Sequence, residues 1–158
     1  YQGDGDLASI GMAETIHAAN RGENITVIFI NNAIYGMTQG QMAPTTLIGQ
    51  KTKTTPRGRD PETTGYPLKV CELLDQLVAP VLLARTTVVT PKHVRQTKAL
   101  LKKAFQCQME NVGYSLIEVL SPCPTYWHMT PMEAYHFIEQ TVTDSFPLGV
   151  IRDVKDRA

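Results

Sequence analysis

The sequence predicts an α/β protein: a parallel β-sheet with helices on both faces. Short, apolar, β-branched segments alternate along the chain with segments whose apolar residues recur every three to four positions, which is the pattern of β-α-β units. The chain has 158 residues, 42% of them hydrophobic, which suits one domain with one ordinary core. We therefore expect a single three-layer domain over residues 1–158, with residues 145–158 as a tail of unclear structure.

The first half of the chain contains two expected elements and one long loop. Residues 7–20 have helical periodicity, and Gly22 follows as a helix stop. Residues 25–30, ITVIFI, are almost continuously apolar and predict a central strand covered on both faces. Residues 31–66 lose periodicity and are rich in Gly, Pro, Thr and Gln, and an ordered loop of this length usually binds a ligand.

The second half of the chain continues the alternation. Proline suits the first turn of a helix, threonine is a good N-cap, and the T-x-x-E pattern at residues 130–133 is a capping box. The expected elements are a helix beginning at Pro67, a strand at 81–88, a helix from Thr90 to 110, a strand at 114–120 and a helix from Thr130 to 143.

Composition excludes several classes of partner. Fifteen basic and fifteen acidic residues cancel, so no nucleic-acid-binding or membrane-binding charge pattern is present. The longest apolar run, residues 27–30, is far shorter than the ~20 residues of a membrane span. Three widely spaced cysteines argue against a disulfide scaffold and favour the cytoplasm. We expect an N-terminally truncated or processed polypeptide, because only two residues precede the first motif, where a strand is expected.

That first motif is Gly3-Asp4-Gly5-Asp6, placed between an expected strand end and a helix start. Glycines allow close approach of the backbone, and a helix N-terminus favours a diphosphate. One β-α-β unit later, Asn31-Asn32 lies at the carboxyl end of the next strand. The Asp4 carboxylate, the Asn32 amide oxygen and the main-chain carbonyl of Ile34 are hard oxygen ligands suited to Mg²⁺. Either motif alone fits an ordinary turn, and their combination favours a metal–diphosphate site.

The combination of a GDG and an Asn pair resembles the cofactor motif of thiamine diphosphate enzymes. Residues 34–46, IYGMTQGQMAPTT, resemble the YG[ML]T-x-GQ-x-[SA]-P-T stretch of 2-oxoacid:ferredoxin oxidoreductase beta subunits, and residues 149–153, GVIRD, resemble the close of those subunits. The loop at residues 49–67 is similar to that of the 2-oxoisovalerate (branched-chain) type. The resemblance covers nearly the whole chain.

The resemblance implies the three-layer thiamine diphosphate-binding fold and a set of site residues. Cys123 lies in a segment similar to the family's SPC-x-T, whose cysteine helps to ligate a [4Fe–4S] cluster; the other cluster ligands would precede Tyr1. Gln39 stands where members acting on dicarboxylic 2-oxoacids can carry Lys. Arg57 and Arg59 are candidate contacts for substrate or coenzyme A, although solvated loop charges are the more common explanation of such residues. The implied cofactor-binding residues are Gly3, Asp4, Gly5, Asp6, Asn32, Tyr35, Gly36, Met37 and Thr38, with Asp4, Asn32 and the Ile34 carbonyl on Mg²⁺.

The reaction that the resemblance implies is oxidative decarboxylation of a 2-oxoacid to acyl-CoA, with electrons passed to ferredoxin. An alpha subunit would supply the glutamate that activates the cofactor, gamma and delta subunits could complete the assembly, and the chain alone would be inert. Two alternatives remain: a non-oxidative thiamine diphosphate enzyme such as acetolactate synthase or pyruvate decarboxylase, and a non-catalytic phosphate-binding assembly domain. Cys71 and Cys107 are expected to be buried thiols without a role.

Overall fold

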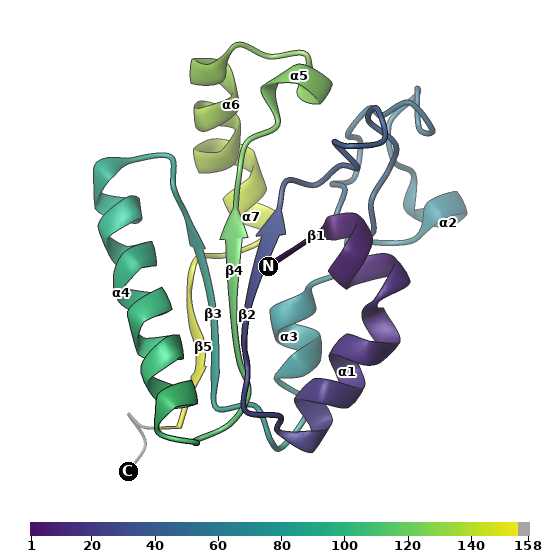
Figure 1. The fold of residues 1–158 in the computed structure, drawn as a ribbon. Coiled ribbons are helices and arrows are strands. Elements are labelled where there is room, and N and C mark those ends of the chain that lie inside the picture. The colour runs from purple at the N-terminus through teal and green to yellow at the C-terminus, as the bar shows by residue number, and fades with distance from the viewer. Residues whose placement is uncertain (155–158) are drawn as a thin grey trace.

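A computed structural model describes residues 1–154 of the chain. Its centre is a five-stranded sheet in the order β1-β2-β4-β3-β5, in which the first four strands are parallel and β5 runs antiparallel to β3 (Figure 1). The strands are β1 (Gln2–Gly3), β2 (Thr26–Asn31), β3 (Leu82–Thr87), β4 (Ser115–Leu120) and β5 (Gly149–Asp153).

Helices cover both faces of the sheet, with α4 on one side and α1 and α3 on the other, while α5 and α6 lie beyond the carboxyl ends of the strands (Figure 1). None of the helices in residues 1–154 is long and apolar enough to cross a membrane. The helical segments are η1 (Asp6–Ile10), α1 (Met12–Arg21), α2 (Pro61–Thr64), α3 (Val70–Leu74), α4 (Pro91–Met109), α5 (Pro124–Trp127), α6 (Pro131–Phe137), η2 (Ile138–Val142) and α7 (Thr143–Ser145).

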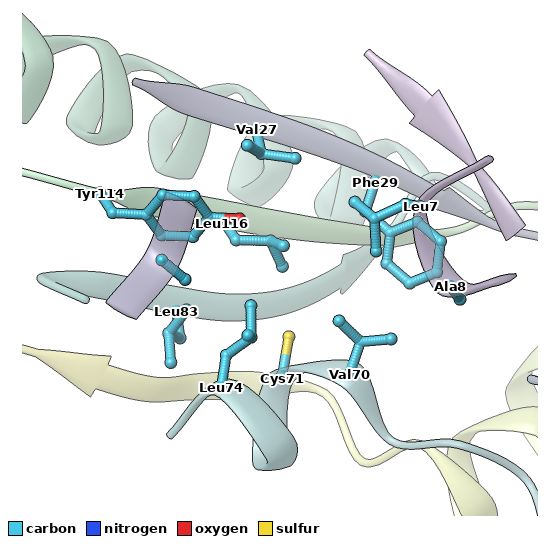
Figure 2. Close-up of a cluster of buried hydrophobic side chains, with 11 residues drawn as sticks. Leu7, Ala8, Val27, Phe29, Val70, Cys71, Leu74, Leu83, Tyr114 and Leu116 are labelled. Atoms are coloured by element: carbon cyan, nitrogen blue, oxygen red, sulfur yellow. The ribbon is translucent and has the colours of Figure 1, made fainter. Parts of the chain in front are cut away.

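The two faces of the sheet have separate apolar cores because successive side chains of a strand point to opposite faces. On the side of α1 and α3, Phe29, Leu83 and Leu116 pack against Val70 and Leu74, and Cys71 lies in the same cluster (Figure 2). On the side of α4, Ile117 and Val119 pack against Ala104 and Cys107. The expectation that Cys71 and Cys107 are buried is confirmed.

A third cluster covers the carboxyl ends of the strands. Trp127 of α5 packs edge-on against Phe137 of α6, with ring centroids 5.2 Å apart. Ile34, Leu47 and Leu120 join this cluster from the loops and from β4. The cluster therefore braces the segment that follows β2, which is where the polar motifs of the sequence meet.

Several local expectations are confirmed. The Thr90 hydroxyl accepts from the His93 N–H at the start of α4, and Thr130 and Glu133 form both bonds of a capping box. Gly22 ends α1 in the left-handed conformation, with φ of 66°.

Three expectations need correction. Residues 7–20 are not one α-helix: a π-helical turn precedes α1, and a Cβ at Gly11 would lie 2.8 Å from the Asp6 carbonyl oxygen, so this turn requires glycine. The helix expected from Pro67 begins only at Val70, because the Leu68 N–H donates to the Pro44 carbonyl and holds the segment extended.

The third correction concerns the expected parallel sheet, because residues 149–153 of the tail form the antiparallel edge strand β5. Arg152 secures this strand through hydrogen bonds to Asp75 and to the Leu77 carbonyl at 2.5 Å, and Asp153 pairs with Lys103. The sheet is therefore mixed and not purely parallel. Residues 155–158 of the expected tail lie outside the described part of the chain.

Candidate functional site

A hollow of about 710 Å³ lies at the carboxyl ends of β1 and β2. In a parallel sheet this edge is where loops from neighbouring strands converge, and ligands of α/β proteins usually bind there. The β1 strand ends at Gly3 and leads directly into Asp4, and β2 ends at Asn31 and leads into Asn32. Parallel pairing of Gly3 with Ile30 brings these two strand ends together.

The hollow contains every residue that the sequence predicted to bind the cofactor. Exposed Ile10 and Met37 add apolar surface at the same place. The predicted substrate residues Gln39, Arg57 and Arg59 are not among its lining residues. The lining is formed by Tyr1, Gly3, Asp4, Gly5, Asp6, Ser9, Ile10, Ile30, Asn32, Ile34, Tyr35, Gly36, Met37 and Thr38.

Asp4 is the buried acid of the site, with only 3% of its surface exposed. One carboxylate oxygen accepts from the Asn32 backbone N–H at 3.2 Å, and the other accepts from the Thr45 hydroxyl at 2.6 Å. Burial, together with the nearby negative charge of Glu118, raises the pKa of Asp4 to about 6, although both hydrogen bonds favour the charged form. Asp4 and Asn32 are thus in direct contact.

The turn after β2 has an uncommon backbone that side chains hold in place. Ala33 has φ of 56°, a left-handed conformation that costs a non-glycine residue on the order of 1 kcal/mol or more. Its N–H donates to the Asn31 side chain at 3.0 Å, and its carbonyl accepts from the Thr46 hydroxyl at 2.7 Å. The Trp127 indole N–H donates to the Asn32 carbonyl at 3.1 Å.

Asn32 completes the turn, because its side-chain oxygen accepts from the Ile34 N–H at 3.3 Å. This oxygen therefore lies on the same short turn as the Ile34 carbonyl that the sequence analysis assigned to Mg²⁺. The arrangement depends on contacts from three separate parts of the chain, the loop at Thr46, the helix at Trp127 and the strand end itself.

The residues present fit a divalent cation bound to a diphosphate. A carboxylate and an amide oxygen meet in one hollow, and both are ligands that Mg²⁺ accepts. A cation there would favour the ionised form of Asp4, which burial otherwise disfavours. A Cβ placed on Gly3 would meet no protein atom within 4 Å, so the glycine leaves the space beside Asp4 open. At Gly5 a Cβ would lie 3.1 Å from the Tyr35 ring, so the backbone and the ring approach closely only with glycine.

Cys123 lies beside the hollow, next to Gly36. A Cβ built on Gly36 would lie 3.5 Å from the Cys123 sulfur. The thiol is half-buried, and burial raises its pKa. Cys71 and Cys107 lie in two other core clusters, on opposite faces of the sheet. Within residues 1–154 no group of three or more His, Cys, Asp or Glu side chains could hold a metal ion. The described residues by themselves do not form a [4Fe–4S] site.

Arg59 does not face the hollow and holds the long loop together instead. The residue is 5% exposed, and burial lowers the pKa of its guanidinium. In this conformation it has no free donor for a substrate, so the geometry argues against the substrate contact expected of it. Its five N–H donors go to the carbonyl oxygens of Gly65 at 2.9 Å, Pro44 at 2.8 Å, Thr46 at 2.6 Å, Thr64 at 3.2 Å and Tyr66 at 2.8 Å.

The other two predicted substrate residues lie elsewhere on the loop. Arg57 is exposed. Gln39 lines a second hollow of about 660 Å³ together with Lys51, Lys53 and His128, and its side-chain oxygen accepts from Lys53 at 3.1 Å. A contact between Gln39 and a substrate remains a prediction.

Sequence reasoning missed four residues that shape the site, namely Thr45, Thr46, Trp127 and Glu118. The two threonines lie within the APTT stretch at residues 43–46, so that motif could have indicated them. The tryptophan and the glutamate reach the site through contacts 95 and 87 residues apart in sequence, for which no local pattern exists.

A buried acid and an asparagine turn meet where two neighbouring parallel strands end, and α/β proteins usually bind their ligands at this edge of the sheet. The family model "Thiamine pyrophosphate enzyme, C-terminal TPP binding domain" matches residues 1–119, and the chain belongs to this family. Membership agrees with the fold and with the cofactor class that the sequence predicted.

Two similar proteins are named subunits of enzymes that act on 2-oxoacids. The chain is 52% identical over 153 residues to ketoisovalerate oxidoreductase subunit VorA of Methanothermobacter thermautotrophicus, covering 97% of this chain and 32% of that protein. It is 35% identical over 140 residues to 2-oxoglutarate synthase subunit KorB of Archaeoglobus fulgidus, covering 89% of this chain and 48% of that protein. The chain thus spans about a third to a half of the length of these relatives. The resemblance to 2-oxoacid:ferredoxin oxidoreductase subunits is confirmed.

A solved structure confirms the fold class. The 2-oxoglutarate:ferredoxin oxidoreductase from Magnetococcus marinus, with 2-oxoglutarate, coenzyme A and succinyl-CoA bound, superposes with a TM-score of 0.72 at 24% identity. The match covers 96% of this chain and 54% of that one.

Proposed function

We propose that this chain is the thiamine diphosphate- and Mg²⁺-binding part of a cytoplasmic oxidoreductase that converts a 2-oxoacid to acyl-CoA and passes the electrons to ferredoxin. The observation that carries the proposal is the contact between Asp4 and Asn32 in one hollow at the carboxyl ends of β1 and β2. Family membership supports the cofactor, and the names of the relatives support the reaction.

The chain's own residues would bind and orient the cofactor. Asp4, Asn32 and the Ile34 carbonyl would hold Mg²⁺, and the open space beside Gly3 would admit the diphosphate next to the first turn of a helix. Tyr35, together with Gly36, Met37 and Thr38, would line the path of the rest of the cofactor. When bound, thiamine diphosphate supplies the carbanion chemistry for decarboxylation.

The substrate and partners are proposed from the relatives. The higher identity to a ketoisovalerate oxidoreductase subunit than to a 2-oxoglutarate synthase subunit favours a branched-chain 2-oxoacid. The activating glutamate would come from an alpha subunit, and gamma and delta subunits would accompany it. Cys123 would join a [4Fe–4S] cluster whose other ligands lie outside the described residues, and it lies beside Gly36, close to the cofactor hollow.

Calorimetric titration of thiamine diphosphate, with and without Mg²⁺, tests the cofactor assignment. Metal-dependent binding that is lost in Asp4→Ala and in Asn32→Ala, with the fold retained, is the expected result. Binding that is independent of metal or unaffected by both changes would refute the assignment. The reaction is tested with the assembled protein by following ferredoxin reduction with coenzyme A and either 2-oxoisovalerate or 2-oxoglutarate, and faster reduction with 2-oxoisovalerate is expected.

A further inference from the structure

A row of buried polar side chains crosses the sheet from α3 to the asparagine turn. Arg85 of β3 and Glu118 of β4 are neighbours in the parallel register, and neither side chain has any exposed surface. Asn31, at the end of β2, is 2% exposed. Phe29 pairs with Glu118 in the register, and Asn31 lies two residues further along the same face of β2. The row therefore joins three adjacent strands on one face of the sheet.

Arg85 is held from several directions. Its Nε donates to Glu118 Oε2 at 2.8 Å, and its two terminal nitrogens donate to the two oxygens of Glu72 at 2.8 and 2.5 Å. Its guanidinium lies 5.3 Å from the centre of the Phe146 ring, and it also donates to the Pro147 carbonyl. Burial alone would lower the pKa of Arg85, but its hydrogen bonds to Glu72 and the charge of Glu118 outweigh burial and raise it.

Glu118 uses its second oxygen to accept from the Asn31 side-chain nitrogen at 2.7 Å. An ionised carboxylate only accepts hydrogen bonds, so Asn31 must turn its NH₂ group toward Glu118. The amide oxygen of Asn31 then faces the opposite way, and it accepts from the Ala33 N–H at 3.0 Å. Glu118 therefore determines the orientation of the group that holds the left-handed Ala33.

A buried arginine–glutamate pair is weak evidence of a stabilising role, because apolar residues of similar volume often stabilise a core as well or better. A polar row of this kind does fix one geometry, since Arg85 and Asn31 each occupy one oxygen of Glu118. The geometry fixed here is that of the turn carrying Asn32 and Ile34, whose first N–H donates to Asp4.

We propose that Glu118 is a positioning residue for the Mg²⁺ site: held by Arg85, it orients the Asn31 amide and thereby fixes the turn that presents Asn32 and the Ile34 carbonyl to the metal. The inference rests on the proposed function. Replacing a group that hydrogen-bonds to and orients metal ligands typically lowers metal affinity about 10–100-fold.

The test exchanges the polarity of one hydrogen bond. In Glu118→Gln only one acceptor oxygen remains, and the charged Arg85 takes it. The glutamine NH₂ group then faces the NH₂ group of Asn31, so the turn loses its orienting contact. In the double variant Asn31→Asp with Glu118→Gln, the glutamine donates to the aspartate and accepts from Arg85, and the aspartate still accepts from the Ala33 N–H. All three hydrogen bonds and the net charge of the row return.

Glu72→Gln is the matched control, because it weakens the contact with Arg85 at the half-exposed end of the row without touching Asn31. For each variant, isolated with any partner subunits, two quantities are measured: the Mg²⁺ dissociation constant by calorimetry at saturating thiamine diphosphate, and the unfolding temperature without metal. The second quantity reports the purely structural effect of each change.

We expect the Mg²⁺ dissociation constant to rise about 10–100-fold in Glu118→Gln and to return to within about threefold of wild type in the double variant. Glu72→Gln should lower the unfolding temperature by a few degrees and leave the dissociation constant within about threefold. If the wild type binds Mg²⁺ and Glu118→Gln binds it equally well, the inference is wrong. A double variant that stays as weak as the single one overturns it too. If the wild type itself shows no metal-dependent binding, the proposed function fails and this inference fails with it.

Discussion

Replacing Arg59 with methionine tests how the long loop after β2 is held. Methionine keeps much of the length of the side chain and removes all five N–H donors, which serve carbonyls on both arms of the loop. The loop also carries Thr45, whose hydroxyl donates to Asp4. Loss of Arg59 should therefore reduce stability and loosen a contact of the candidate site.

The magnitude follows from the contacts. A hydrogen bond from a charged donor contributes about 1.5–3 kcal/mol, and we take about 1 kcal/mol each because the carbonyls can regain water when the loop opens. The cost of burying the guanidinium, which also lowers its pKa, offsets about 1–2 kcal/mol of that sum. The free energy of unfolding should fall by about 3–4 kcal/mol in Arg59→Met. Arg59→Lys should lose about 2 kcal/mol, because an ammonium has three donors and no planar fork.

Urea unfolding in metal-free buffer, followed by circular dichroism, measures these changes. Arg57→Met is the matched control, because Arg57 is an exposed arginine on the same loop, and its stability should stay within about 0.5 kcal/mol of wild type. A loss below about 1 kcal/mol for Arg59→Met, or equal losses for the two arginines, would refute the view that Arg59 holds the loop.

Three further predictions concern the site and the thiols. Burial raises the pKa of Asp4 from 3.8 to about 6, so the ionised acid destabilises the metal-free fold above pH 6 and ceases to do so as it protonates toward pH 4. In urea titrations with chelator, Asp4→Asn should accordingly be about 1–3 kcal/mol more stable than wild type above pH 6, and equally stable below about pH 4. A difference in the free energy of unfolding that does not change with pH would contradict this. Gly3→Ala should change stability by at most about 0.5 kcal/mol, because its methyl group meets no protein atom. The same methyl group would occupy the space proposed for the diphosphate, so thiamine diphosphate binding measured by calorimetry should weaken at least about tenfold. Unchanged affinity would place the diphosphate elsewhere. Alkylation mapped by mass spectrometry should label Cys123 in the folded protein and label Cys71 and Cys107 only after unfolding, whereas early labelling of Cys71 would show that its core opens.

Most of the fold could be predicted from local patterns. Short apolar runs predict the strands at Thr26–Asn31, Leu82–Thr87 and Ser115–Leu120. N-terminal capping residues predict where α4 and α6 begin. Each of these patterns spans only a few neighbouring residues, so it can be recognised without knowledge of the tertiary structure. The edge strand β5 was missed because its pairing depends on Arg152 contacts with the segment before β3, far away in the sequence.

The meeting of Asp4 and Asn32 was predictable for a related reason. A β-α-β unit returns the second strand beside the first, so residues that end both strands must meet at one edge of the sheet. The sequence therefore determined by itself the class of fold, the place of the candidate site and the oxygen ligands expected there.

Only the tertiary structure decided how those ligands are held and which charged residues are free to act elsewhere. In the sequence, Arg59 was a candidate contact for an anion. In the structure, the path of the loop places carbonyl oxygens around the guanidinium, and all its N–H groups donate to them. Glu118 gave no sequence signal, yet the strand register places it between Arg85 and Asn31. The physical reason is that a side-chain hydrogen bond depends on distance and direction in space. Those are determined when distant strands pair and the loop packs, and no local pattern of residues encodes them.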